Sequence, residues 1–287
     1  MNTDKYSAVW VSYSSISDFL RCPRAYYLKN IYRNPATGNK IKLMSPPLAL
    51  GQAVHEVVES LSVLPVKERF RESLLLKYNL AWQKINGKQG GFGDGGVEMD
   101  YKKRGEEMLK RLMDEPGPLK NLAVKIKQAL PYFWLSPKDN IILCGRIDWL
   151  EFSPDTNSVH IIDFKTGRHD ENLESLQLPI YYLLAKNCQP YSVTKASYWY
   201  LERPHGLTKK PLPEYDTALD KVLTIAKKIK VARQLGVFKC SHKDGCPVCK
   251  PYEMILDREA EFVGTDNHNY DVYILEKAPV VVESVIL

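Results

Sequence analysis

The chain places an acidic and a basic side chain at the end of an apolar, β-prone run. The segment 158–168 reads SVHIIDFKTGR, in which Asp163 and Lys165 are separated by a single residue. Because side chains alternate across a strand, both emerge on the same face while Phe164 points the other way. An isolated pair of this kind is usually a surface ion pair on an edge strand, so other residues must decide whether it does chemistry.

A second acid comes from the preceding β-rich run, IILCGRIDWLEF, which contains Asp148 and is followed by the turn formers SPDTNS. We expect the two runs to form a hairpin that brings Asp148 beside Asp163. Two buried neighbouring carboxylates repel each other unless a cation lies between them, and oxygen ligands suit Mg²⁺ or Mn²⁺. Such an ion activates a bound water, while Lys165 stabilises the transition state. These residue types predict metal-dependent hydrolysis of phosphodiester bonds.

Two helical segments add polar residues at a spacing of one turn. GQAVHEVVE places Gly51, His55 and Glu59 on a single helix face, where His55 could look into the site and Gly51 would permit a close backbone approach. LQLPIYYLL spaces Gln177 and Tyr181 in the same way. A lone helical histidine is more often structural, and the amide and phenol also fit the wet edge of an amphipathic helix.

Taken together, the motifs resemble the PD-(D/E)XK nuclease superfamily, and specifically its RecB-like branch. The resemblance rests on GQAVHEVVE, GRIDWL, DFKTGR and QLPIYY, which occur in the family's order. It implies an α/β fold, with a restriction-endonuclease-like core whose mixed central sheet is flanked by helices. It also implies that a divalent ion is held by the side chains of His55, Asp148 and Asp163 and by the backbone carbonyl of Phe164.

The same resemblance makes Lys165 the catalytic lysine beside these ligands, and Gln177 and Tyr181 residues that contact DNA or support the site. The implied activity is that of a Mg²⁺- or Mn²⁺-dependent deoxyribonuclease, an exonuclease or end-trimming enzyme acting on single-stranded DNA. The competing interpretation is a non-catalytic DNA-binding or scaffold subunit of a DNA repair or CRISPR-adaptation complex. The complete set of acids, lysine and histidine argues against it.

Three of the six cysteines are clustered in CSHKDGCPVC, as Cys240, Cys246 and Cys249. A cytosolic protein does not readily keep disulfides, so this trio favours metal binding. In the iron-sulfur subgroup of these nucleases, which includes AddB-type subunits and CRISPR-adaptation nucleases, an N-terminal cysteine followed by proline joins three C-terminal ones around a [4Fe-4S] cluster. By this resemblance Cys22 is the fourth ligand. Structural zinc held by the same thiolates, or with His242 as a ligand, is the alternative.

Composition and charge narrow the class of protein. With 44% hydrophobic and 26% charged residues, the chain is neither fibrous nor disordered. The net charge of +6 is compatible with a polyanionic partner, although solvated lysine-rich helix faces are a commoner explanation. No apolar run is long enough to cross a bilayer and the first residues lack a signal-peptide pattern, so we expect a cytoplasmic protein without membrane contact.

The sequence also suggests how the chain is divided. We expect a nuclease domain over residues 1–250, with cluster ligands at 22 and in 240–249, and a C-terminal extension of unknown role over 251–287. Helical periodicity predicts a helical insertion over 62–130. Within it, NGKQGGFGDGGVE fits the dinucleotide pattern G-x-G-x-x-G, but it follows a helical pattern rather than a strand, so we reject that function and expect a flexible surface loop.

Individual helices can also be predicted. Ser15, three residues ahead of Asp18, resembles a capping box at the start of the first helix. In the insertion, the last of the helical patterns covers residues 122–130. Further helices are expected over 171–187 and 217–235, with the strand KASYWYLE between them.

Overall fold

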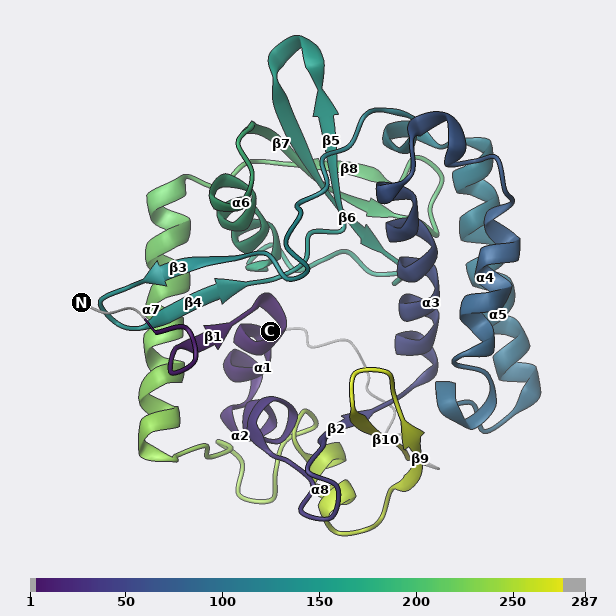
Figure 1. The fold of residues 1–287 in the computed structure, drawn as a ribbon. Helices are drawn as coiled ribbons and strands as arrows, with labels where there is room; N and C mark the ends of the chain where they lie inside the picture. The colour runs from purple at the N-terminus through teal and green to yellow at the C-terminus, as the bar shows by residue number, and fades with distance from the viewer. Residues whose placement is uncertain (1–3, 276–287) are drawn as a thin grey trace.

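The computed structural model describes residues 4–275, in which three mixed sheets are flanked by helices (Figure 1). The α-helices of this part of the chain are α1 (Tyr13–Arg21), α2 (Pro23–Tyr26), α3 (Pro46–Ser60), α4 (Leu74–Gln83), α5 (Gly95–Asp114), α6 (Gln177–Cys188), α7 (Tyr215–Leu235) and α8 (Lys250–Leu256). Its strands are β1 (Val9–Val11), β2 (Lys40–Leu43), β3 (Tyr132–Ser136), β4 (Ile141–Cys144), β5 (Trp149–Ser153), β6 (Ser158–Lys165), β7 (Ser192–Tyr200), β8 (Leu207–Lys210), β9 (Glu261–Thr265) and β10 (Tyr270–Ile274). The predicted α/β class is confirmed, and the arrangement is consistent with a restriction-endonuclease-like core.

The central sheet has the strand order β5-β6-β7-β8. β5 and β6 form the predicted antiparallel hairpin, with Trp149 opposite Ile162. β6 and β7 are parallel, so the chain must cross over between them, and α6 makes that crossover. The other sheets have the orders β1-β4-β3 and β2-β10-β9.

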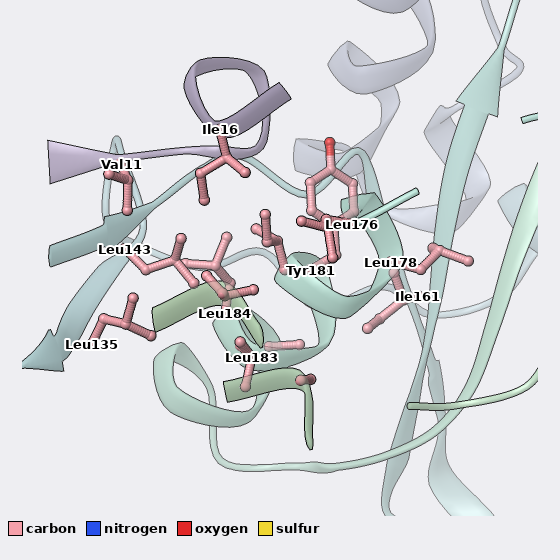
Figure 2. Close-up of a cluster of buried hydrophobic side chains, with 14 of the residues drawn as sticks. Val11, Ile16, Leu135, Leu143, Ile161, Leu176, Leu178, Tyr181, Leu183 and Leu184 are labelled. Atoms are coloured by element: carbon pink, nitrogen blue, oxygen red, sulfur yellow. The ribbon is translucent and has the colours of Figure 1, made fainter. Parts of the chain in front are cut away.

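Strand β6 is covered on both faces, which explains its almost continuous run of apolar residues. Ile161 packs into a core formed with α6 and α7, and Figure 2 shows it beside Leu178 of α6. Ile162 and Phe164 point the other way, into a second core that includes residues of α3, α4 and α5. The central sheet therefore lies between two helical layers, as in other sheets whose central strands are buried on both faces.

The prediction of a helix over residues 122–130 is wrong. Phe152 of β5 donates its backbone N–H to Leu122 O at 2.7 Å, and Val124 N donates to Leu150 O at 2.8 Å. Residues 122–124 therefore run along β5 in extended form, and residues 127–130 form bends. The apolar residues of this segment fit both a helical and a strand period, and the open edge of β5 decides between them by offering backbone partners.

Two helices begin elsewhere than predicted. The first helix is capped by Ser12, because the Ser12 side chain accepts from Ser15 N at 3.3 Å and Ser15 Oγ accepts from Ser12 N at 2.8 Å. The capping box thus lies one turn before the predicted one. Helix α6 begins at Gln177 rather than near residue 171, so residues 166–176 form a loop.

The C-terminal part of the described chain joins the fold through its own sheet. β10 pairs in parallel with β2, and antiparallel with β9. Residues 276–287 of the predicted extension lie outside the described residues. Among the helices of residues 4–275, none combines the length and apolar character needed to cross a membrane.

Gly105 lies where α5 packs closely against α4 and α3. A Cβ added at this position would lie 2.0 Å from Tyr78 Oη and 3.0 Å from Leu50 Cδ1. Both neighbours are buried and closely packed, so neither can move without disturbing the second core.

We expect Gly105→Ala to lower the free energy of unfolding by about 1–3 kcal/mol through overpacking, although alanine is the better helix former. Gly95→Ala, in the same helix, is the matched control, because a Cβ there meets no atom within 4 Å. Urea unfolding followed by circular dichroism measures both. Equal stability of the two variants would contradict this packing of α5 against α3 and α4.

Candidate active site

The site is built where β5 begins and β6 ends. Trp149 pairs with Ile162, so Asp148, one residue before β5, lies opposite Asp163. Because β5 has not yet begun, the Phe164 amide has no strand partner on this side, and it donates to Asp148 Oδ2 at 3.0 Å. The N–H and C=O of one strand residue point to the same side, so the Phe164 carbonyl also opens toward Asp148.

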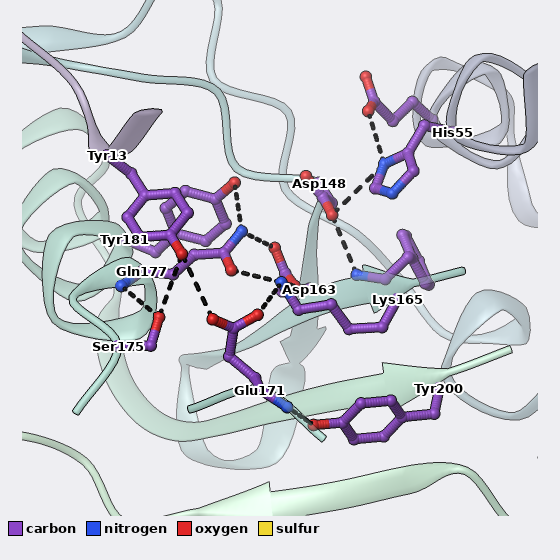
Figure 3. A network of polar contacts seen from close by, with 12 residues as sticks. Tyr13, His55, Asp148, Asp163, Lys165, Glu171, Ser175, Gln177, Tyr181 and Tyr200 are labelled. Carbon is purple, nitrogen blue, oxygen red and sulfur yellow. Dashed lines mark hydrogen bonds and ion pairs between the residues drawn. The ribbon is translucent and has the colours of Figure 1, made fainter. Parts of the chain in front are cut away.

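Helix α3 brings a histidine and a third carboxylate to the same place (Figure 3). His55 Nδ1 lies 3.6 Å from Asp148 Oδ2 and 3.3 Å from Glu59 Oε1. One potential ligand atom from each of the three residues lies within 4.8 Å of the others. The close backbone approach expected at Gly51 is present, since a Cβ there would lie 3.3 Å from Thr166 Oγ1.

On the other side of Asp148, helix α6 holds the acid-lysine pair of β6. Gln177 Nε2 donates to Asp163 Oδ1 at 2.5 Å, and Gln177 Oε1 accepts from Lys165 Nζ. Lys165 Nζ also lies 2.9 Å from Asp163 Oδ2. The Tyr181 hydroxyl lies 3.5 Å from Gln177 Nε2, and both side chains are buried. Gln177 and Tyr181 therefore contact the site from inside the protein.

One contact at the site was not predicted from the sequence. Glu171 Oε2 lies 3.0 Å from Lys165 Nζ, and Glu171 Oε1 accepts from the Tyr13 hydroxyl at 3.3 Å (Figure 3). Glu171 belongs to the loop before α6, although the sequence predicts the start of a helix there, and no motif includes its side chain. Glu59 lies one helical turn from His55, a spacing that indicates contact between the two side chains, but the motifs give it no role.

The electrostatics of the site show a surplus of buried negative charge. Asp148 and Asp163 are 9% and 1% exposed. Burial, and then the charge of Asp163, raise the pKa of Asp148 to about 8. Burial also raises the pKa of Asp163, against the opposing effect of Lys165. Burial disfavours the charged form of His55, but its hydrogen bond to Glu59 and the charge of Asp148 raise its pKa to about 9.

His55, Glu59 and Asp148 form a compact group that fits a divalent cation, and the predicted ligand Asp163 lies beside this group rather than within it. Asp163 Oδ2 has Lys165 Nζ as its neighbour at 2.9 Å, and a carboxylate oxygen with one such partner retains a second lone pair for a cation. Carboxylate oxygens, a backbone carbonyl and one imidazole are a donor set that Mn²⁺ accepts, and the oxygens suit Mg²⁺. The lysine is held in its charged form, because Asp163 and Glu171 raise its pKa despite burial.

The four predicted cysteines lie together at a second place in the molecule. One sulfur from each residue lies within 4.8 Å of the others, in the group Cys22, Cys240, Cys246 and Cys249. Cys22 occupies the extended residue between α1 and α2, and Cys249 precedes α8. His242 is exposed, with Nδ1 3.2 Å from Ser241 Oγ, and is not part of this group.

The surroundings of these sulfurs fit a thiolate-ligated metal group. Backbone amides point at them: His242 N lies 3.4 Å from Cys240 Sγ, and Cys246 N lies 3.2 Å from Cys249 Sγ. Burial disfavours the thiolate of Cys246, but the amides of Cys249 and Val248 lower its pKa to about 7. Burial raises the pKa of Cys249 to about 12. The four thiols therefore need a cation to ionise together, and both an iron-sulfur cluster and zinc would supply one.

A comparison with known protein families covers both the candidate active site and the cysteine group. The family model described as the PD-(D/E)XK nuclease superfamily matches residues 10–254. The matched range contains the acid, lysine, histidine and glutamine motifs and all the cysteines of the second group, and it ends before β9. No curated protein matches the chain.

Replacing Asp148 tests whether the surplus of buried negative charge at the site destabilises the cation-free protein. A folded-state pKa of about 8 for Asp148, against 3.8 when unfolded, means that stability is lost as the pH rises from about 4 to 8. We therefore expect Asp148→Asn to raise the melting temperature of the cation-free protein at pH 8, by about 5 °C or more, and to leave it nearly unchanged at pH 4. Differential scanning fluorimetry in a chelator measures this.

If Asp148 is a ligand of the divalent ion, as predicted, Mn²⁺ should raise the melting temperature of the unmodified protein and not that of the same variant. Asp155→Asn is the matched control, since Asp155 is exposed at the turn of the β5–β6 hairpin. If Asp148→Asn lowers the melting temperature at pH 8, the carboxylates are not a source of strain.

Proposed function

Because the chain belongs to the PD-(D/E)XK nuclease superfamily, we propose that it is a divalent-metal-dependent deoxyribonuclease whose active site lies between α3, β6 and α6. The observation that carries this proposal is the buried pair of opposed carboxylates, Asp148 and Asp163, with Lys165 at 2.9 Å from one of them. A structural role does not require two buried acids to face each other.

In this proposal the divalent ion is held by the side chains of His55, Asp148 and Asp163 and by the carbonyl of Phe164. The ion, Mg²⁺ or Mn²⁺, supplies a water of lowered pKa and charge neutralisation at the scissile phosphate when it is bound. Glu59 holds the His55 ring at 3.3 Å, which orients it as a second carboxylate commonly orients a metal-bound histidine.

Lys165 acts as an electrostatic group rather than as a base. Its raised pKa keeps the ammonium charged, so it can stabilise negative charge that develops on the phosphate or orient the attacking water. Gln177 donates to Asp163 and accepts from Lys165, and it thereby fixes the distance between the two groups. We propose that Gln177 and Tyr181 support the site, and contact of either with DNA stays a prediction.

The proposed substrate is a single DNA strand, trimmed from an end, as the resemblance to the RecB-like branch implies. Two cavities, of about 650 and 390 Å³, both have Glu59 and Arg146 in their lining. The first is also lined by His55 and the second by Asp148, so the site is open on two sides. This supports a strand that passes across the site.

We also propose that the four clustered cysteines hold a [4Fe-4S] cluster. The donor set is four thiolates, and amides from the chain point at the sulfurs, a kind of contact that tunes iron-sulfur clusters. The ligands come from the α1–α2 junction and from the segment before α8. Arg24 joins α2 to α8 directly, because its Nε donates to Glu253 Oε1 at 2.5 Å and its Nη2 donates to Glu253 Oε2 at 3.0 Å.

The nuclease proposal is tested with end-labelled single-stranded DNA and Mn²⁺. We expect the protein to degrade linear strands and leave circular ones intact, and Asp163→Ala to reduce the rate by at least about 10²–10³-fold, as loss of transition-state stabilisation does. Asp155→Ala is the control. Equal degradation by both variants, or none by the unmodified protein, would remove the enzyme claim and favour a DNA-binding or scaffold role.

The cluster proposal is tested on anaerobically purified protein. We expect visible absorbance, bound iron and acid-labile sulfide, and a lower melting temperature in Cys246→Ser together with loss of the iron. Cys188→Ser should keep all three, because Cys188 lies outside the group of four. Colourless protein that contains zinc would replace the cluster by a structural zinc site.

A further inference from the structure

The extended segment beside β5 presents lysines in a row. Val124 and Ile126 are half-buried and pack against the first core, whereas Lys125 and Lys127 between and after them are exposed. This alternation is that of a strand, and it turns both lysines away from the core. A helix over the same residues would have spread them around its circumference.

These lysines line the smaller cavity next to the candidate active site. The cavity, of about 390 Å³, is bordered by Lys125, Lys127 and Arg146 together with Asp148 and Glu59. Three cationic side chains therefore share one hollow with two of the acids of the site.

Within residues 4–275 none of these three cations forms an ion pair. Lys125 Nζ donates to Ser62 Oγ at 3.2 Å, and Arg146 Nε donates to Ala129 O at 3.3 Å. Both partners are neutral, so the positive charges are held in place without being neutralised. Such a group attracts anions.

The larger cavity on the other side of the site differs in this respect. Its lysines are paired with acids: Lys42 Nζ lies 3.3 Å from Asp266 Oδ2, and Lys84 Nζ lies 2.5 Å from Glu56 Oε1. Arg146 borders both cavities, so the difference lies in the lysines: within residues 4–275 those of the larger cavity are paired with acids, whereas Lys125 and Lys127 of the smaller one are not.

We propose that Lys125, Lys127 and Arg146 form a phosphate-binding site for the backbone of a single-stranded polynucleotide on the β5 side of the scissile phosphate. This inference rests on the proposed nuclease function and adds the direction from which the strand is held. Phosphate contacts position a strand without reading its bases. Arg146 can grip a phosphate with two N–H groups, and the lysines act as point charges.

The salt dependence of binding distinguishes direct phosphate contact from an effect on folding. Each cation that contacts a single strand contributes about 0.7 to the slope of log affinity against log salt concentration. We expect Lys125→Gln/Lys127→Gln to weaken binding of a fluorescent oligonucleotide at least about 10-fold at low salt, and to reduce the slope by about 1.4. Fluorescence anisotropy in a Lys165→Met background with Mn²⁺ measures binding without cleavage.

The matched control is Lys221→Gln/Lys228→Gln. Both lysines are exposed on α7, which lies at the left of Figure 1 away from α3, and the control removes the same charge. Its affinity for the oligonucleotide and its salt slope should equal those of the Lys165→Met protein without further substitutions. An unchanged slope in Lys125→Gln/Lys127→Gln, with an unchanged melting temperature, would overturn the phosphate site.

The outcome for the nuclease proposal is read separately. Suppose that the protein without substitutions cleaves DNA in Mn²⁺, but that Lys125→Gln/Lys127→Gln does not reduce the salt slope of binding. The phosphate site is then wrong and the enzyme proposal stands. If the Lys165→Met protein binds no oligonucleotide and the protein without substitutions cleaves none, both the phosphate site and the enzyme proposal are wrong. Reduced slopes in both double variants would indicate general charge attraction and would also overturn the assignment of these residues.

Discussion

The opposition of two buried carboxylates is the constraint around which this molecule is organised. Asp148 and Asp163 face each other because β5 begins one residue after the first acid, in a register that the hairpin with β6 determines. Neither acid can keep its charge there without positive charge nearby. His55 and Lys165 supply part of it, one from α3 and the other from β6 itself.

The two helical layers have separate duties toward this pair. Helix α3 lies against the face of the sheet that carries Phe164, and it contributes an imidazole and a carboxylate on neighbouring turns. Helix α6 lies against the opposite face, where its first residue, Gln177, bridges the acid and the lysine of β6. Side chains with different tasks thus arrive from different sides, and the end of the sheet is where they meet.

Much of this site could be predicted from the sequence, because its motifs are local. The alternation around Asp163 and the one-turn spacing of His55 from Glu59 depend only on the local strand and helix, and not on the rest of the chain. The non-helical course of residues 122–130 could not be predicted, since it depends on the free edge of β5, a partner later in the chain. Glu171 was missed for a similar reason, because only the course of the loop after β6 brings it to the lysine.

The cysteine group has a consequence for how the protein matures. Cys22 is made early in synthesis, whereas Cys240, Cys246 and Cys249 follow more than two hundred residues later. A metal group that needs all four cannot be completed on the ribosome until nearly the entire matched region has emerged. Insertion of the proposed cluster is therefore a late step, and it would join α1 and α2 to the segment before α8 only after nearly all of the matched region has been made.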